Sequence, residues 1–158
     1  MSKKTNAIRL LDSNKIEYRL MSYNAPEGFL DGVSVATEIG IEPDRVFKTL
    51  VTQGTSKEYY VCIIPVALEL DLKKAAAFFK EKKIEMIPSK DITKVTGYIK
   101  GGCSPISMKK LYKTAIDISA SNHNCIVVSA GKVGLQVELS VPDLIKVTGA
   151  HFADLVRS

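Results

Sequence analysis

The fold is decided by two stretches of sequence, residues 46–52 (VFKTLVT) and residues 59–64 (YYVCII). Both are rich in β-branched and aromatic side chains, which favour extended structure. The second stretch is almost continuously apolar, as a strand covered on both faces would be. Residues 53–57 (QGTSK) lie between them and contain a glycine, which favours a turn. The sequence therefore predicts a central pair of strands joined by a short loop.

Helices are expected on either side of this pair. They are predicted at residues 5–14, 34–40, 71–82 and 91–96, and a last helix is predicted to start at Ser140. Ser34, Asp71 and Ser140 have side chains that can cap a helix N-terminus, and Gly40 can end a helix. The apolar residues of the first and third segments recur at helical spacing, so each of these helices should bury one side.

Further strands are predicted at residues 17–21, 114–119, 125–129 and 135–139, and residues 23–33 are expected to form a loop. Several strands follow one another without an intervening helix, which favours hairpins over strict βαβ alternation. We therefore predict the α+β class.

The composition is ordinary for a globular protein. Of 158 residues, 46% are hydrophobic and 25% are charged, so we expect one domain that covers residues 1–158. No apolar run approaches the roughly 18 residues of a membrane span, and no signal-peptide core follows Met1. A cytoplasmic protein without membrane contact is expected. Cys62, Cys103 and Cys125 are odd in number and lack C-x-x-C spacing, which argues against a disulfide framework.

The net charge of +5 permits a polyanionic partner. Lysines occur in pairs at residues 73–74, 82–83 and 109–110. Such pairs can attract RNA phosphates in a salt-sensitive way. Solvated helix faces explain the same pairs equally well.

A glycine loop is predicted at residues 98–106 (YIKGGCSPI). Gly101 and Gly102 allow a sharp turn and a close approach to a ligand, because neither has a Cβ. Such a turn can aim successive N–H groups at an anion or a developing oxyanion. By itself the motif also fits a plain structural turn.

Metal and cofactor chemistry have little support in the sequence. His123 and His151 stand alone, outside any metal-ligand spacing, and residues 131–134 (GKVG) lack the spacing of a phosphate-binding loop. We predict neither a metal nor an organic cofactor. Ser104 and Ser129 have no obvious histidine base, and Cys103 would need a neighbouring base or cation to act as a nucleophile.

Lys48 interrupts an apolar row, because it shares a strand face with Val46 and Leu50. Such a lysine can sit at a solvent-facing edge or in a binding site. The strand pattern leaves both interpretations open.

Three segments in this order and spacing resemble the YbaK/EbsC family of aminoacyl-tRNA deacylases: residues 46–50 (VFKTL), the glycine loop, and residues 128–135 (VSAGKVGL). The similarity covers nearly the whole chain and is greatest to the branch that hydrolyses Cys-tRNA(Pro). It implies a mixed, curled, barrel-like β-sheet flanked by helices. It also implies a trans-editing hydrolase whose partners are the acceptor end of an aminoacyl-tRNA and, as a candidate, prolyl-tRNA synthetase.

The resemblance also implies roles for individual residues. Lys48 matches an essential lysine near the bound aminoacyl-adenosine, and the N–H groups of Gly101, Gly102 and Cys103 would stabilise the oxyanion. Substrate-binding positions are matched by Tyr23, Phe29, Tyr98, Ser104 and Ser129. Two positions depart from the family pattern: Gln136 stands where an acidic residue is frequent, and Ser107 stands where a glycine is usual.

In the mechanism that the resemblance implies, the thiol of the attached cysteine attacks its own ester and expels the ribose oxygen. The enzyme then needs no nucleophile of its own. Two alternatives remain open: a deacylase for another small amino acid such as alanine on tRNA(Pro), and a non-catalytic module that binds tRNA or a synthetase.

Overall fold

The predicted strand pair forms the centre of the fold. The computed structural model describes residues 4–25 and 31–158. Strands β2 (Phe47–Gly54) and β3 (Tyr59–Pro65) pair antiparallel with Lys48 opposite Ile64. They lie inside a five-stranded sheet of order β4-β2-β3-β5-β8. Strand β5 (Lys113–Asp117) runs parallel to β3, so the sheet is mixed.

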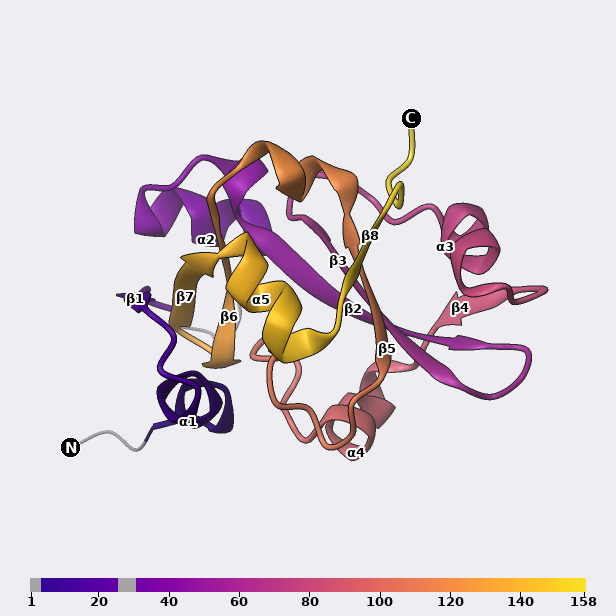
Figure 1. Cartoon of the computed structure of the whole chain (residues 1–158), viewed down its shortest axis with the longest axis horizontal. Helices are drawn as coiled ribbons and strands as arrows, with labels where there is room; N and C mark the ends of the chain where they lie inside the picture. The colour runs from indigo at the N-terminus through magenta and orange to yellow at the C-terminus, as the bar shows by residue number, and fades with distance from the viewer. Residues whose placement is uncertain (1–3, 26–30) are drawn as a thin grey trace.

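A second sheet has the order β1-β7-β6 and is antiparallel throughout. Its strands are β1 (Tyr18–Ser22), β6 (Cys125–Lys132) and β7 (Leu135–Ser140). One parallel bridge, between Val46 and Val127, connects the two sheets. The predicted α+β class and the mixed, curled sheet are confirmed, although the strands form two sheets joined at one point (Figure 1).

The described residues contain five α-helices. They are α1 (Asn6–Ser13), α2 (Gly32–Ile39), α3 (Leu72–Phe79), α4 (Ile92–Thr96) and α5 (Val141–Thr148). Short 3₁₀ helices cover Pro43–Arg45, Ser89–Asp91 and Ile118–Asn122. Helices α1 and α5 lie over the same side of the second sheet, and α3 lies beside β4 at the opposite end of the molecule (Figure 1).

Capping explains where these helices begin, with one correction to the prediction. Asp71 caps α3 and Ser140 caps α5, as predicted. Helix α2 begins earlier than expected, because the carboxylate of Asp31 rather than Ser34 accepts the capping bond, from the Ser34 N–H. Helix α3 also ends earlier than predicted, because Lys80 takes a left-handed conformation with φ of 59°.

The sequence pattern missed two strands, β4 (Ile84–Met86) and β8 (His151–Ala153). Each has only three residues, which is too short for a period of two to be visible. Strand β4 nevertheless decides the shape of the sheet edge, because it pairs with β2 only at Thr52–Gly54. Within residues 4–25 and 31–158, the preceding part of β2 therefore has no strand on that side.

The main hydrophobic core lies between the two sheets, with α1 and α5 against it. It includes Phe47, Ile63, Ile126 and Leu144, all at most 2% exposed. A second core on the other face of β3 packs Cys62 and Ile64 against α3. In the part of the chain that is described, no helix is both long and apolar enough to traverse a membrane.

Candidate active site

A cleft of about 300 Å³ lies along the uncovered part of β2. The glycine loop, the β6–β7 hairpin and the start of α2 supply its other walls. It brings together five of the residues predicted from the sequence: Tyr23, Lys48, Gly101, Cys103 and Ser129. These residues are far apart in the chain, and only the fold gathers them.

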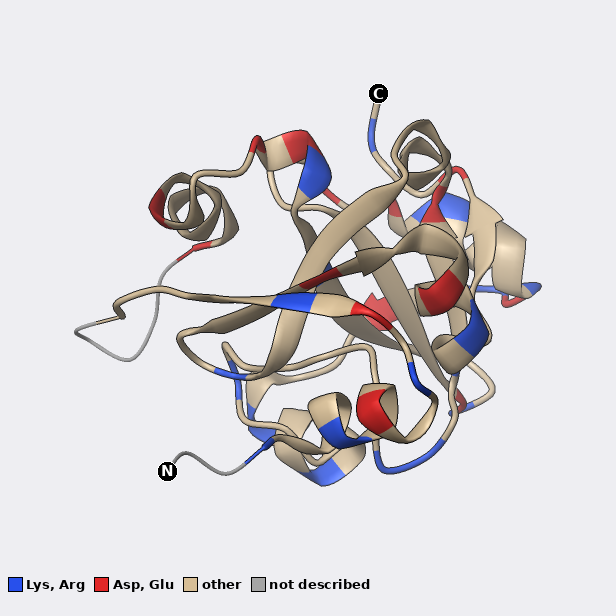
Figure 2. Cartoon of the chain, turned by 60° about the vertical axis from the view of Figure 1, so that its left-hand side comes forward, with Lys and Arg blue, Asp and Glu red and all other residues tan. Residues whose placement is uncertain are grey.

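Lys48 is half-buried in the wall of this cleft. Burial lowers the pKa of its ammonium group from the ordinary value, and the Coulombic attraction of Glu69 opposes the effect in part. Lys100 lines the same cleft, whereas none of the described residues that line it is acidic. The cleft is therefore cationic and suits an anionic ligand such as a phosphate. Lys and Arg residues are also frequent along the lower edge of the molecule, where α1 and α4 lie (Figure 2).

The two glycines of the loop are required for different reasons. Gly101 has a φ of 86°, which a residue with a Cβ rarely adopts. Gly102 packs against the β6–β7 turn so closely that a Cβ would lie 2.9 Å from the Val133 nitrogen. The N–H of Gly102 donates to the Ile99 carbonyl at 3.0 Å. Its predicted role as an oxyanion donor therefore does not fit the structure.

The N–H groups of Gly101 and Cys103 remain as candidate donors. Within the described residues, neither has an acceptor in the protein. Both residues line the cleft, whereas Gly102 does not. The expected oxyanion site is thus narrowed to two backbone donors that flank a structural glycine.

The Cys103 side chain is a poor nucleophile in this setting. Burial raises the pKa of its thiol to about 11, and the hydrogen bond to Thr96 offsets only part of this rise. The side chain packs against the edge of two hydrophobic core clusters, as do Met108 and Tyr112. At neutral pH the thiol is therefore almost entirely protonated.

Tyr98 and Ser104, predicted to bind substrate, belong to the glycine loop, but both side chains are buried and neither lines the cleft. The Tyr98 hydroxyl donates to the Ile106 carbonyl at 2.5 Å, and the Ser104 hydroxyl accepts from the Ile106 N–H at 3.2 Å. Both side chains hold the loop in shape instead. Phe29, the other predicted aromatic, lies outside the described residues.

Ser107, at the end of the glycine loop, has a backbone conformation that is more usual for glycine. Its φ is 60°, in the left-handed region. A non-glycine residue there costs about 1 kcal/mol or more of strain. Ser107 thus adopts a conformation that glycine takes more easily.

Tyr23 directly follows β1, and Ser129 lies in β6; both line the cleft. The Tyr23 N–H donates to the Gly134 carbonyl at 2.9 Å, which fixes the segment that follows β1. The Ser129 hydroxyl accepts from the Gly131 N–H at 3.2 Å, inside a β-bulge of β6. The hydroxyl proton of Ser129 remains free to donate to a ligand in the cleft.

Known proteins resemble this chain over most of its length. A family model for the aminoacyl-tRNA editing domain matches residues 31–147. The chain belongs to this family. EbsC of Enterococcus faecalis, provisionally named a Cys-tRNA(Pro)/Cys-tRNA(Cys) deacylase, is 44% identical over 152 residues, which are 96% of this chain and 93% of the relative. The family predicted from the sequence is confirmed.

Solved structures show the same editing-domain fold. One, described as a trans-editing enzyme for prolyl-tRNA synthetase, has a TM-score of 0.83 and is 19% identical, and the match covers 99% of this chain and all of that one. A hypothetical protein has a TM-score of 0.85 at 19% identity, with 95% of this chain and 98% of that chain covered. At this identity the likeness concerns the fold alone.

Lys100 and two uncharged polar residues of the editing-domain cleft were not among the predicted site residues. Thr49 and Gln136 both line it. In the described part of the chain, the Thr49 hydroxyl is the one fully buried side-chain polar atom without a hydrogen-bond partner. Gln136 is 6% exposed, and its amide has no partner among the described residues. No sequence pattern signals an unpartnered group, because it depends on which segments meet in space.

The backbone of Thr49 is also turned toward the cleft. Val66 donates to the Val46 carbonyl and Gly54 donates to the Glu58 carbonyl, so the even-numbered residues of β2 exchange hydrogen bonds with β3. The backbone N–H and C=O groups of the odd-numbered residues of β2 point away from β3. Thr49 therefore presents an N–H, a C=O and a hydroxyl at the open strand edge, where a bound substrate can supply their partners.

The Thr49 hydroxyl gives the first testable prediction. Thr49→Val keeps the side-chain shape and removes an unsatisfied polar atom, so the free energy of unfolding should stay the same or rise by up to about 2 kcal/mol. The loss of a substrate contact should lower kcat/KM for aminoacyl-tRNA deacylation by about tenfold. Urea unfolding and a deacylation assay measure the two effects.

Thr52→Val in the same strand is the matched control. The Thr52 hydroxyl is fully buried and donates to the Tyr60 carbonyl at 3.0 Å, outside the cleft. Its removal should lower the free energy of unfolding by about 1 kcal/mol and leave deacylation intact. Equal activity of Thr49→Val and wild type would show that the Thr49 hydroxyl does not contact substrate.

Proposed function

We propose that this protein is a trans-editing deacylase that hydrolyses the ester of Cys-tRNA(Pro), by attack of the substrate's own thiol. The observation that carries the proposal is the cleft, which unites Lys48 and two free backbone donors but contains no activated protein nucleophile. The name of the 44% identical relative supports the choice of substrate.

A separate editing enzyme answers a physical problem of prolyl-tRNA synthetase. Cysteine and proline side chains differ little in size, and a difference of about a methylene gives only about 10–200-fold discrimination. Hydrolysis of the wrong ester in a second site supplies the remaining accuracy. Recognition there can rest on the chemistry of the thiol, which proline lacks.

The proposed reaction begins when the substrate sulfur attacks its own ester carbonyl. A carbon–sulfur bond forms, and the bond from the carbonyl carbon to the ribose oxygen breaks. The thiol proton leaves to solvent, the ribose oxygen takes up a proton, and water then opens the cyclic thioester to free cysteine. The overall change is hydrolysis of the ester, and it consumes one water without an oxidant or reductant.

The cleft residues then have positioning and electrostatic roles. The N–H groups of Gly101 and Cys103 stabilise the negative charge on the carbonyl oxygen. Lys48 binds the phosphate of the terminal adenosine or the carbonyl region, and Ser129 holds the aminoacyl group. Orientation of the thiol against the carbonyl supplies a large part of the acceleration, because it makes the attack unimolecular.

The cleft, with a volume of about 300 Å³, is far too small to enclose a whole tRNA. We therefore propose that it contacts the acceptor end, and that prolyl-tRNA synthetase is the partner that selects tRNA(Pro). A domain that only binds tRNA would not need free donors and a half-buried lysine in one cleft. A deacylation assay with and without the protein separates these two functions.

Lys48 should be essential for catalysis and dispensable for folding. Because its ammonium is half-buried and forms no ion pair in the described residues, its removal should not lower the free energy of unfolding appreciably. Lys48→Ala should reduce kcat/KM for Cys-tRNA(Pro) by about 100-fold or more. Lys100→Ala, in the same cleft, is the matched control and should cost less. A folded Lys48→Ala protein with near wild-type activity would refute the assignment.

The substrate thiol, and not Cys103, should be the nucleophile. Cys103→Ala should retain substantial activity, because the backbone N–H stays in place and the lost thiol is protonated at neutral pH. Ser-tRNA(Pro) should be cleaved much more slowly than Cys-tRNA(Pro), since a hydroxyl has the shape but not the nucleophilicity of a thiol. Alkylation of the substrate thiol should block turnover. A covalent adduct trapped on Cys103, with an inactive folded Cys103→Ala protein, would establish the opposite mechanism.

A further inference from the structure

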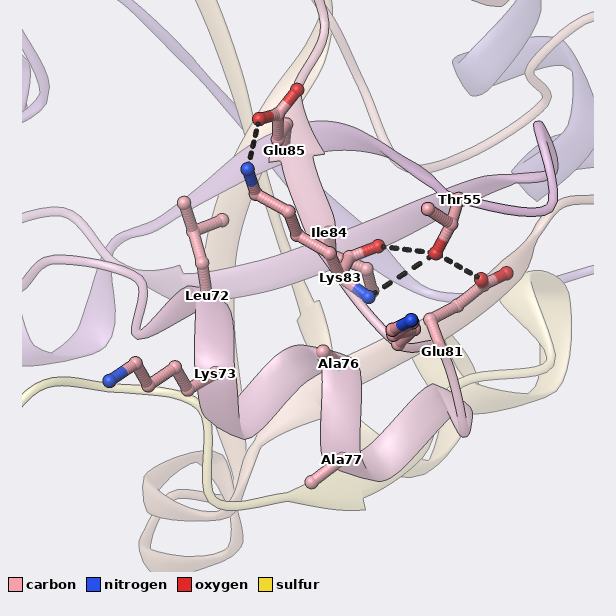
Figure 3. Close-up of a pocket in the computed structure, with 10 residues that line it drawn as sticks. Thr55, Leu72, Lys73, Ala76, Ala77, Glu81, Lys83, Ile84 and Glu85 are labelled. Atoms are coloured by element: carbon pink, nitrogen blue, oxygen red, sulfur yellow. Dashed lines mark hydrogen bonds and ion pairs between the residues drawn. The ribbon is translucent and has the colours of Figure 1, made fainter.

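A second and larger hollow lies away from the cleft, between helix α3 and strand β4 (Figure 3). Its volume is about 880 Å³, and it shares no lining residue with the cleft. Leu72, Ala76 and Ile84 form an apolar floor. Ile84 also belongs to the core beneath, so the floor rests on packed side chains.

The strand that borders this groove has an open edge. β4 is the outermost strand of its sheet. Ile87 donates to the Val51 carbonyl, and Thr55 donates to the Lys83 carbonyl, so the odd-numbered residues of β4 and its flanks bond to β2. The N–H and C=O groups of Ile84 and Met86 therefore point outward. Met86 is 45% exposed and shares a strand face with Ile84.

Some charged side chains around the groove have an oppositely charged or hydrogen-bonding partner, and others have none. Glu81 accepts hydrogen bonds from Tyr60 and Ser56 and is already satisfied. Lys83 pairs with Glu85 at 3.0 Å. Among the described residues, neither Lys73 nor Lys82 has a carboxylate at ion-pair distance. The rim thus offers two unpaired ammonium groups beside an apolar floor and a free strand edge.

We propose that this groove is a docking site for an extended, acidic segment of a partner protein, which adds to β4 as a further strand. The outward groups of Ile84 and Met86 would form the main-chain hydrogen bonds. Alternate side chains of the segment would then point toward the Leu72–Ile84 floor, which selects apolar residues. Acidic residues between them would meet Lys73 and Lys82 at the rim.

The chemistry of the groove favours a peptide over RNA. Single-stranded RNA is held mainly by aromatic side chains that stack on bases and by rows of cations. The groove has an aliphatic floor, and none of its lining residues is aromatic. Unpaired amide and carbonyl groups at a fixed strand spacing match a polypeptide backbone and have no counterpart in a ribose–phosphate chain.

A labelled heptapeptide of alternating glutamate and valine is the probe. It should bind with a Kd below about 1 mM, and the amide protons of Ile84 and Met86 should exchange more slowly in its presence. A heptapeptide of alternating lysine and valine should bind at least about tenfold more weakly. Equal binding of the two peptides, or unchanged exchange at Ile84 and Met86, would overturn the proposal. So would a short single-stranded RNA that displaces the acidic peptide from these residues.

Two pairs of variants separate the strand edge from the charges. Met86→Pro removes one outward N–H and leaves the bonds to β2 in place, so peptide binding should be lost, whereas Met86→Thr should retain most of it. The double variant Lys73→Glu with Lys82→Glu should weaken binding at least about tenfold, and Lys110→Glu, outside the groove, should not. Peptide binding that survives both Met86→Pro and the charge reversal would refute the site. Deacylation of Cys-tRNA(Pro) alone should be unchanged in Met86→Pro and Met86→Thr, so this proposal and the proposed function fail or hold separately.

Discussion

The organisation of the site depends on one feature of strand pairing: among the described residues, no strand pairs with the middle of β2 on one side. Strand β4 pairs with β2 only from Thr52 onward, and at the other end Val46 forms the single bridge to Val127 of the second sheet. The intervening stretch would be a liability in a sheet that had to exclude other chains. Here the glycine loop and the β6–β7 hairpin lie on either side of this stretch, and the open edge of β2 forms the base of the cleft.

Burial in the cleft has two consequences for its ionisable groups. It lowers the pKa of Lys48 and raises that of Cys103, because desolvation disfavours whichever form carries a charge. The thiol therefore stays neutral and the loop contributes through its backbone alone. Tyr98 and Ser104 make this possible, since their hydrogen bonds to Ile106 fix the loop and leave the N–H groups of Gly101 and Cys103 unengaged.

The sequence was sufficient for features that depend on local pattern. The β2–β3 hairpin, the caps at Asp71 and Ser140, and the glycine loop all follow from residues near one another in the chain. Prediction from the sequence failed for features that depend on contacts between segments far apart in the chain. Strand β4 is too short to show a pattern. Gly102 must be small because the Val133 backbone lies next to it. The Thr49 hydroxyl lacks a hydrogen-bond partner because no described residue from another segment bonds to it. The same reason explains why Tyr98 and Ser104 were assigned to substrate binding.

The neutral Gln136 gives the cleft a consistent electrostatic character. With Lys48 and Lys100 in its walls and no carboxylate among the described residues that line it, the described part of the cleft carries an excess of positive charge. A nearby cation lowers the pKa of a thiol and so raises the fraction of thiolate at neutral pH. The field that holds a phosphate would therefore also generate the substrate thiolate and stabilise the oxyanion that it forms. An acidic residue at position 136 would oppose all three effects, so the amide at this position suits a reaction in which the attacking group belongs to the substrate.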